Sequence, residues 1–442
     1  MKFIQTLQNI WKIEDLRNRI TTTLWFIVLY RLGTTIVLPG IDPASLVALK
    51  TQTRGGLMAL LDMFSGGAFS NASVFALGIM PYISASIVMQ LAAIVVPSIQ
   101  KMQREGESGR RKINQWTRYL TILILLVQGP LYLVNLRTQL MAVGATLPEG
   151  FWFAFTSTIF MAAGSMLTLW MGERITDKGV GNGVSFIILV GILARLPRAF
   201  VAEVALRFQL PGGLFVIILE IILLLLVMAG AILLVQGTRR VPVQYAKRTV
   251  GNRQFGGARQ YIPLKVNAAN VMPIIFAQAL MFIPLTFIGF NTETTSPFWQ
   301  TFLSGRGFWY NFIFAVLIIL FTYMYTAVTI NPGQMSDELK NSNGFIPGVK
   351  PGRATKDYLD DVMSKITLPG AIFLALVAIM PAFAQYFGVS QEFSQFFGGT
   401  SLIILVGVVL DTLQQIESHL LQHHYDGLLE TGHIKGRQGY MY

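Results

Sequence analysis

Charged residues inside the long apolar stretches are the first candidates for chemistry in this sequence. Only Arg31, Glu220 and Asp411 fall within or near those stretches. Ion-coupled transporters depend on ionisable residues inside the membrane, but three scattered charges make a poor proton relay. Arg31 and Asp411 lie close enough to helix ends to snorkel or to pair. A small-solute transporter that uses Glu220 or Asp411 remains an open alternative, and the other interpretation of Glu220 is an external-side polar contact.

The histidines are the other reactive side chains, and all four lie near the C-terminal end: His419, His423, His424 and His433. The spacing of the first two suits a metal on a helix end, but no carboxylate–histidine motif frames them, and a polar helix end at the membrane surface is favoured. The chain has no cysteine and no GxxxxGK[ST] phosphate loop, so it has no thiolate chemistry and does not power itself with nucleotide. We therefore expect no enzymatic activity, no metal and no cofactor.

The composition is that of a membrane protein. The 442 residues are 53% hydrophobic and only 13% charged, with a mean hydropathy of +0.55. Soluble globular chains carry about 25% charged residues, so a soluble globular enzyme is excluded. The formal net charge is +12, from 34 Lys and Arg against 22 Asp and Glu, and the basic residues must lie outside the hydrocarbon.

Ten stretches are apolar enough to be membrane helices, which need roughly 20 mostly apolar residues. We expect spans near 20–39, 75–96, 119–136, 151–171, 182–194, 213–235, 268–290, 308–330, 366–388 and 398–415. The prediction is an all-α polytopic membrane protein.

The distribution of Lys and Arg decides its orientation. With the N-terminus in the cytoplasm, 26 of the 34 basic residues fall in inside segments, seven in outside segments and one in the first span. Because basic residues are retained on the cytoplasmic side, both termini are predicted to be cytoplasmic. Residues 1–19 lack a signal-peptide cleavage site and are predicted to form an amphipathic helix in the cytoplasmic interface, with a soluble turn as the alternative. Its apolar face consists of Phe3, Ile4, Leu7, Ile10 and Trp11.

An internal repeat relates the two halves of the chain. Residues 183–191 (GVSFIILVG) and 399–407 (GTSLIILVG) agree at seven of nine positions, and 79–83 (IMPYI) resembles 271–275 (VMPII). Both matches pair helix n with helix n+5, so two five-helix halves must have opposite orientations in the membrane. Such inverted repeats place their working site near the midplane between the halves, and proline-interrupted helices point to it.

The predicted divisions of the chain follow from this repeat. They are the N-terminal segment 1–19, a first half 20–197, a second half 198–418 and a cytoplasmic tail 419–442.

The repeat also pairs aliphatic residues near the midplane. Ile83 corresponds to Ile275, and Ile188 corresponds to Ile404. Branched aliphatic side chains offer neither charge nor hydrogen bonds, which suits a constriction that blocks ions by dewetting. Ordinary helix packing explains the same pattern and is favoured by the pattern alone.

Three loops are long enough to have roles of their own. In the outside loop 40–74, residues 57–64 predict a short helix followed by a flexible stop, which either folds back into the bundle or stays on the surface. The inside loops 236–267 and 331–365 are basic and rich in Gly and Pro. They are either solvated positive-inside loops or docking sites for a polyanion or an acidic protein face.

Several long blocks carry a resemblance to a known family. They are MFSGGA (63–68), ALGIMPYISASI (76–87), EGESGRRK (105–112), GNG (181–183), YAKR (245–248), PLKVN (263–267), GFIPG (344–348) and FGGTS (397–401). With these blocks, essentially the whole chain resembles the SecY family of pore-forming subunits of bacterial protein-conducting channels.

The resemblance implies an hourglass channel between the two halves, closed at its waist by an aliphatic ring. By position the ring consists of Ile79, Ile83, Val184, Ile188, Ile275 and Ile404. Residues 57–71 resemble the family's plug, with Leu57, Leu60, Phe64, Gly66 and Gly67. The second and seventh spans resemble its lateral gate, with Pro81, Ile87, Gln90, Pro273 and Gln278.

The resemblance also implies partners and a location. The basic loops resemble docking sites for a motor or a ribosome, with Arg240, Lys247, Arg248, Arg253, Lys350 and Arg353. Many family members have arginine where this chain has Lys350, which keeps the charge but loses the bidentate fork.

Implied partners are SecE-like and SecG-like membrane subunits, the SecA motor ATPase, a ribosome with its nascent chain and contact to rRNA, signal peptides, unfolded polypeptides and membrane lipid. The implied function is translocation of unfolded secretory polypeptides across the bacterial cytoplasmic (inner) membrane, with lateral release of apolar segments. A poreless insertase or scaffold is a third alternative.

Overall fold

The computed structural model describes residues 11, 13–43, 45–46, 62, 65–142, 144, 148, 150–209, 211–245, 248–250, 253–255, 259–288 and 307–431. The first half contains the helices α2 (Glu14–Gly33), α5 (Met80–Val95), α6 (Pro97–Arg104), α7 (Glu107–Ala142), α8 (Phe151–Lys178) and α9 (Gly183–Leu193). They are followed by α10 (Leu196–Phe208), α11 (Gly213–Gln236), α12 (Met272–Ile288), α14 (Phe308–Thr329), α15 (Pro332–Asn341), α16 (Arg353–Tyr386), α17 (Gln391–Ser394) and α18 (Gly399–Thr431).

Each of the ten predicted spans overlaps one of these helices. Within the described residues, seven helical segments are long and apolar enough to cross a membrane, and an eighth is obtained if α5 and α6, bent by 103° at their break, count as one. Two of the ten predicted spans correspond to helices that do not meet this criterion. They are α2, which carries Arg17, Arg19 and Arg31, and α12, which is only 17 residues long. The protein is therefore a multi-pass helical membrane protein.

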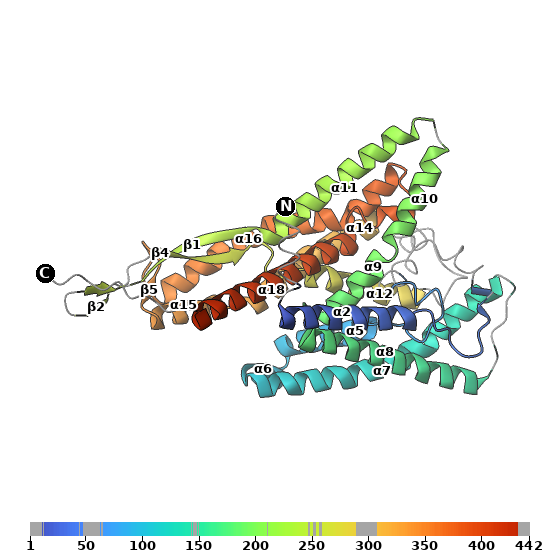
Figure 1. Ribbon diagram of the computed structural model, residues 1–442, viewed down its shortest axis with the longest axis horizontal. Helices are drawn as coiled ribbons and strands as arrows, with labels where there is room; N and C mark the ends of the chain where they lie inside the picture. Colours follow the sequence, from blue (N-terminus) through green and yellow to red (C-terminus); the bar gives the residue numbers. More distant parts are fainter. Residues whose placement is uncertain are drawn as a thin grey trace.

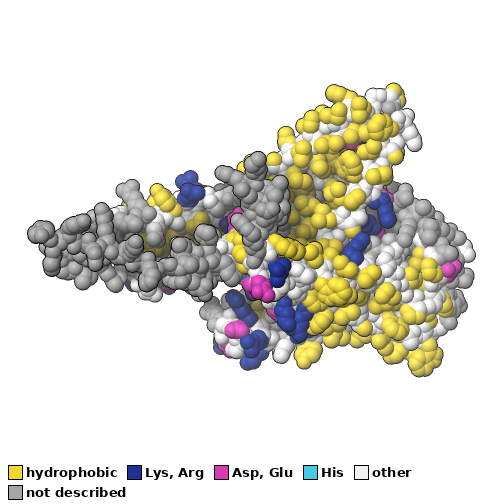
Figure 2. All heavy atoms as spheres, viewed as in Figure 1, with side chains coloured by type: hydrophobic (Ala, Val, Ile, Leu, Met, Phe, Trp, Pro, Cys, Tyr) yellow, Lys and Arg dark blue, Asp and Glu magenta, His cyan; other side chains and the backbone are white. Residues whose placement is uncertain are grey.

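The helices gather into two groups that meet at the middle of the molecule. In Figure 1, α2, α5, α7 and α8 lie together, while α11, α14 and α16 lie on the other side, with α9 between them. The second group has its own large aliphatic core, formed by α11, α12, α14, α16 and α18. Hydrophobic side chains gather on the projecting hairpin of α10 and α11 and on the helices beside it, whereas charged side chains cluster elsewhere on the visible face (Figure 2). Such a surface suits contact with lipid.

The two basic inside loops form a small folded unit with β-structure, which the sequence analysis did not foresee. Strands β1 (Thr238–Tyr245) and β4 (Arg259–Lys265) pair antiparallel, and β5 (Gly344–Phe345) from the second loop pairs with the other edge of β1. Strands β2 (Arg248–Val250) and β3 (Arg253–Phe255) extend the hairpin. The unit has its own core of Val241, Val243, Leu264, Leu339, Ile346, Leu359 and Met363. Valines alternate with exposed residues along β1, and this pattern in the sequence could have predicted the strand.

The prolines of the repeat begin helices and do not interrupt them, which corrects the sequence-based expectation. Pro81 and Pro273 are the second residues of α5 and α12, where a missing N–H costs nothing. The preceding turns have the same geometry, since Gly78 (φ +52°) and Asn270 (φ +50°) occupy corresponding left-handed positions. The repeat seen in the sequence is therefore present in the backbone.

Candidate functional site

The aliphatic centre of the molecule forms where the two groups of helices meet. Ile83 on α5 packs against three separate hydrophobic clusters: the core of the second half, the cluster around α9 and α18, and the cluster around α2 and α8. Val184 on α9 packs against the last two. Ile83 is thus the side chain at which the interiors of both halves converge.

The structure brings the six predicted ring residues to this centre. Ile188 and Ile404 are buried in the cluster around α9 and α18, and Ile83 and Val184 pack against it. Ile79 is buried in the cluster around α2 and α8, against which Ile83 and Val184 also pack. Ile275 packs with Ile83 against the core of the second half. The six residues are therefore linked through Ile83, and the centre offers water no polar group from these side chains.

Two further residues belong to the same centre and were missed. Val271, before α12, and Leu405, on α18, each pack against both the second-half core and the cluster around α9 and α18. The signal for Val271 was available, because the repeat aligns it with Ile79.

The predicted lateral gate is an apolar seam. Ile87 of α5 is buried in the core of the second half, and Ile83 and Leu91 pack against the same core. Gln90 donates a hydrogen bond to Ser86 of its own helix (Nε2 to Oγ, 3.2 Å). Among the described side chains no hydrogen bond joins Gln90 to Gln278, and the contacts of α5 with the second-half core are apolar.

Part of the predicted plug lies within the described residues. Leu57, Leu60 and Phe64 lie outside them, whereas Gly66 and Gly67 are described and adopt left-handed conformations (φ +65° and +94°). A Cβ added at Gly66 would lie 3.0 Å from Nη1 of Arg31 and 3.0 Å from Cα of Gly191, so the chain passes close to α9 here. We refer to Asp62 and residues 65–73 as the outer segment.

Hydrogen bonds from α2 and α7 hold the outer segment. The Tyr30 hydroxyl donates to the Ser65 carbonyl (3.1 Å), and Nη1 of Arg31 donates to the Gly66 carbonyl (2.9 Å). On the other side, the Tyr132 hydroxyl donates to the Phe69 carbonyl (2.7 Å). Arg31 was expected either to snorkel or to pair, and it pairs here with a backbone carbonyl of the outer segment.

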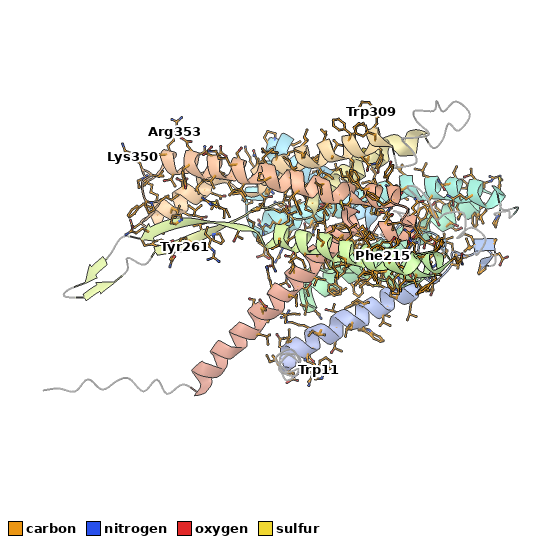
Figure 3. All side chains as sticks on the ribbon, turned by 90° about the horizontal axis from the view of Figure 1, so that it is seen from above. Trp11, Phe215, Tyr261, Trp309, Lys350 and Arg353 are labelled. Carbon is orange, nitrogen blue, oxygen red and sulfur yellow. The ribbon has the colours of Figure 1, made fainter. Side chains whose placement is uncertain are left out.

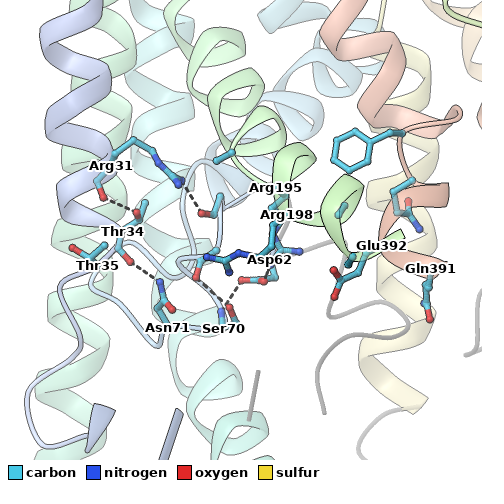
Figure 4. Close-up of a pocket in the computed structure, with 17 residues that line it drawn as sticks. Arg31, Thr34, Thr35, Asp62, Ser70, Asn71, Arg195, Arg198, Gln391 and Glu392 are labelled. Carbon is cyan, nitrogen blue, oxygen red and sulfur yellow. Dashed lines mark hydrogen bonds and ion pairs between the residues drawn. The ribbon is translucent and has the colours of Figure 1, made fainter. Parts of the chain in front are cut away.

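A polar cavity of about 440 Å³ lies beside the outer segment (Figure 4). Its wall includes Arg31, Asp62, Asn71, Arg195, Arg198 and Glu392. Asp62 forms an ion pair with Arg195 at the junction of α9 and α10. No group of three potential metal-ligating side chains occurs within the described part of the chain.

The remaining buried charges form a structural network near the α10–α11 hairpin. Arg207 pairs with Glu203 (2.9 Å) and with Glu220 (2.5 Å), and it donates to the Gly388 carbonyl (2.8 Å). Glu203 in turn accepts from the backbone N–H of Ser390 (3.0 Å). Glu220 therefore makes a polar contact, which is the second of the two interpretations given for it from the sequence. Asp411, the other candidate for a transport role, is exposed on α18.

The predicted docking residues lie in or beside the small β-unit. Arg240 on β1, Lys350 and Arg353 are exposed, and Figure 3 shows the last two at the same end of the molecule as Tyr261 of β4. Arg248 and Arg253 belong to the β2–β3 hairpin, and Lys247 lies outside the described residues. The two basic loops are thus brought to one end of the molecule.

These features define a class of protein: a multi-pass helical membrane protein whose two related halves meet at an aliphatic centre. A family model for SecY matches residues 73–413, and the protein translocase subunit SecY of Streptomyces coelicolor is 41% identical over 434 residues, covering 95% of this chain and 98% of that protein. The chain belongs to the SecY family, which confirms the resemblance seen in the sequence.

Solved structures share the fold at low sequence identity. One was reported to show that the plug domain of the SecY protein stabilises the closed state of the translocation channel; it has a TM-score of 0.65, 16% identity and coverage of 93% of this chain and 94% of that one. Sec61 in the canine ribosome–channel complex matches with a TM-score of 0.62 at 16% identity, again covering 93% and 94%. These matches confirm the predicted helical fold and give the transporter alternative no support.

Proposed function

We propose that this chain is the central pore subunit of a protein-conducting channel. It passes unfolded secretory polypeptides across the membrane and releases apolar segments sideways into lipid. The observation that carries the proposal is the convergence of Ile79, Ile83, Val184, Ile188, Ile275 and Ile404 where the two halves meet. The chain catalyses no reaction in this proposal, and partners supply the energy.

The resting seal follows from the chemistry of this centre. Branched aliphatic side chains bind neither ions nor water, so a narrow passage between them dewets and blocks ions. The same side chains make no directional bonds, so they yield to any passing polypeptide without selecting its sequence. The outer segment, held beside the polar cavity, is the second closure in this proposal.

Lateral release follows from the seam between α5 and the second half. Its closure depends on Ile83, Ile87 and Leu91, and these contacts resemble those that lipid tails make with an exposed helix. Opening the seam therefore exchanges protein contacts for lipid contacts at little cost. A passing segment of roughly 20 apolar residues partitions into lipid, whereas polar segments continue across.

In this proposal the two halves predicted from the repeat move as rigid bodies. The first half (20–197) and the second half (198–418) move apart at the seam, while segment 1–19 and tail 419–442 lie on the cytoplasmic side. The shared left-handed turns before α5 and α12 support the assignment of two related halves.

Exposed aromatic residues mark the start of two membrane helices. Phe151, Trp152 and Phe155 stack at the start of α8, and Phe308, Trp309 and Phe312 stack in a similar geometry at the start of α14. Both helices begin on the external side when the termini are cytoplasmic. Trp and Tyr gather at both membrane interfaces, so these two trios suit a membrane interface, which is the external one of a bacterial inner membrane in the predicted orientation.

The β-unit is the proposed docking surface. Arg240, Lys350 and Arg353 are exposed on it, together with the β2–β3 hairpin. Exposed basic residues suit rRNA or an acidic protein face, and the ribosome contact named for the canine relative supports the same use here. The resemblance adds SecA as motor and SecE-like and SecG-like subunits as membrane partners.

Ion conductance in planar bilayers tests the proposal. We expect the wild-type protein to be silent and the double variant Ile83→Gly, Ile188→Gly to conduct, because glycine removes the aliphatic side chains from the centre. The matched control is Ile218→Gly on the exposed face of α11, which should remain silent. Silence of the ring variant, when it is properly inserted, would mean that these isoleucines are packing residues and that the proposal is wrong.

A further inference from the structure

The outer segment is fixed by contacts of two different kinds. Tyr30, Arg31 and Tyr132 donate hydrogen bonds to its backbone carbonyls. The contact to Arg195 is instead an ion pair between side chains, formed with Asp62. Such a pair depends on two specific side chains, so substitution can remove it without altering the helices that supply the other bonds.

Asp62 also organises the segment internally. Its Oδ1 accepts from the backbone N–H of Ser70 (2.7 Å) while Oδ2 pairs with Arg195. Its own carbonyl accepts from the backbone N–H of Gly67 (2.8 Å) and from the Ser65 hydroxyl (3.2 Å). One carboxylate therefore closes the turn and ties it to the helix junction, so the turn moves as a unit with Asp62.

Arg195 lies where the two halves of the molecule are joined. It precedes α10 and follows α9, the helix that carries Val184 and Ile188 of the aliphatic centre. Beyond it, α10 is tied to the second half through the contacts of Arg207 with Glu220 and with the Gly388 carbonyl. A rotation of the second half against α9 therefore acts on the chain at Arg195.

The Asp62 carboxylate is the buried member of the pair, so its contact with Arg195 is a strong restraint on the outer segment. The Asp62 side chain is 6% exposed and the Arg195 side chain is 33% exposed. Removing one partner of a buried pair leaves an uncompensated charge and is strongly destabilising. Figure 4 shows Arg198 on the same cavity wall; it is exposed and forms no ion pair or hydrogen bond with the described residues, so it is a matched cation without this role.

We propose that the Asp62–Arg195 ion pair is a latch that holds the outer segment in its resting position and couples its release to the separation of the two halves. The latch rests on the proposed channel function, since it needs a pore for the segment to close. Asp62 and Arg195 are positioning residues in this account and do not select the passing polypeptide.

Planar-bilayer conductance of purified, inserted protein tests the latch. We expect Arg195→Gln and Asp62→Asn each to raise the open probability at least about tenfold over wild type, because each removes the contact between Asp62 and Arg195. Arg195 also interacts with Glu392 on the same cavity wall, so Asp62→Asn removes one of its two acidic neighbours. The double variant Asp62→Asn, Arg195→Gln should conduct no more than either single variant, because both changes remove the same interaction. Arg195→Lys, which keeps the charge, should fall close to wild type, and Arg198→Gln should be silent.

The outcomes distinguish a failure of the latch proposal from a failure of the proposed channel function. If Arg195→Gln and Asp62→Asn are silent while Ile83→Gly, Ile188→Gly conducts, the latch is wrong and the channel stands. Equal conductance of Arg198→Gln and Arg195→Gln overturns the latch in favour of a general effect of cavity charge. Silence of every variant, the ring variant included, overturns both proposals. Because Asp62→Asn replaces a side chain of nearly the same shape, it keeps the test decisive if Arg195→Gln fails to insert.

Discussion

The aliphatic centre and the outer segment are held in place by opposite kinds of interaction. At the centre, Ile83 joins three hydrophobic clusters without a directional bond. In the outer segment, Asp62 alone takes part in four polar contacts with defined partners. Hydrophobic contacts weaken gradually as side chains move, whereas an ion pair in a buried site is either made or lost. The centre is therefore suited to yielding around a polypeptide, and the outer segment to switching between two positions.

The largest expected effect comes from the centre. Among single glycine substitutions in the ring, Ile83→Gly should give the greatest ion conductance, because Ile83 touches all three clusters and Ile275 touches one. Planar-bilayer recordings of Ile83→Gly and Ile275→Gly measure the ratio directly. Greater conductance from Ile275→Gly would show that the seal lies closer to α12 than the convergence of clusters indicates.

The Arg207 network provides the next largest effect, and it concerns stability. Arg207→Leu leaves Glu203 and Glu220 buried without their cation, which should cost about 3–5 kcal/mol of unfolding free energy. Thermal unfolding in detergent should show a lower midpoint, while the surviving protein stays silent in bilayers. Arg111→Leu, which breaks an exposed pair with Glu107, is the control and should have almost no effect. An unchanged midpoint for Arg207→Leu contradicts the structural role of the network.

The apolar and polar gate residues of α5 can be compared by substitution on one helix. Ile87→Ala removes a side chain buried in the second-half core and leaves a cavity in the closed seam, which should weaken the seam by more than the loss of one polar contact does. Gln90→Ala removes a bond made within α5 and should cost about 0.6 kcal/mol or less. Export of a substrate with a weakened signal sequence reports gate opening, and Ile87→Ala should raise it more than Gln90→Ala. A larger effect of Gln90→Ala would show that a polar contact of Gln90, and not the apolar seam, holds the gate closed.

The smallest effects separate two glycines of the outer segment. Both Gly66 and Gly67 have positive φ, so alanine at either position costs roughly 1–2 kcal/mol of strain. Only at Gly66 would the added Cβ meet Arg31 and Gly191 at 3.0 Å, whereas nothing lies within 4 Å at Gly67. Basal conductance should therefore be higher for Gly66→Ala than for Gly67→Ala. Equal conductance of the two variants would show that backbone strain alone decides the position of the segment.

The sequence predicted the membrane architecture well because hydropathy and basic loops are local signals. All ten predicted spans overlap helices, and the repeat that aligned Ile79 with Val271 reappears as matching turns at Gly78 and Asn270. The role of proline was misjudged, because sequence alone does not distinguish a first-turn proline from a kink. The β1–β4 hairpin was missed although buried and exposed residues alternate along β1. The pairing of the two-residue strand β5 with β1 is a long-range contact without a local signal.

Polar contacts between distant segments were the least predictable feature. Arg195 and Asp62 lie 133 positions apart, and nothing local in either segment identifies the other as its partner. Arg207 was likewise not recognised as the partner of Glu220, although the weak case for a proton relay had already favoured a polar contact.

Photo-cross-linking of a stalled polypeptide shows directly whether the aliphatic centre surrounds the moving chain. A cross-linking amino acid is placed in turn at the six ring positions and at Ile218 on the exposed face of α11, in membranes supplied with the translocation partners. We expect cross-links to the polypeptide from Ile79, Ile83, Val184, Ile188, Ile275 and Ile404, and none from Ile218. Translocation that proceeds without cross-links from these six positions would contradict the claim that the aliphatic centre surrounds the moving chain.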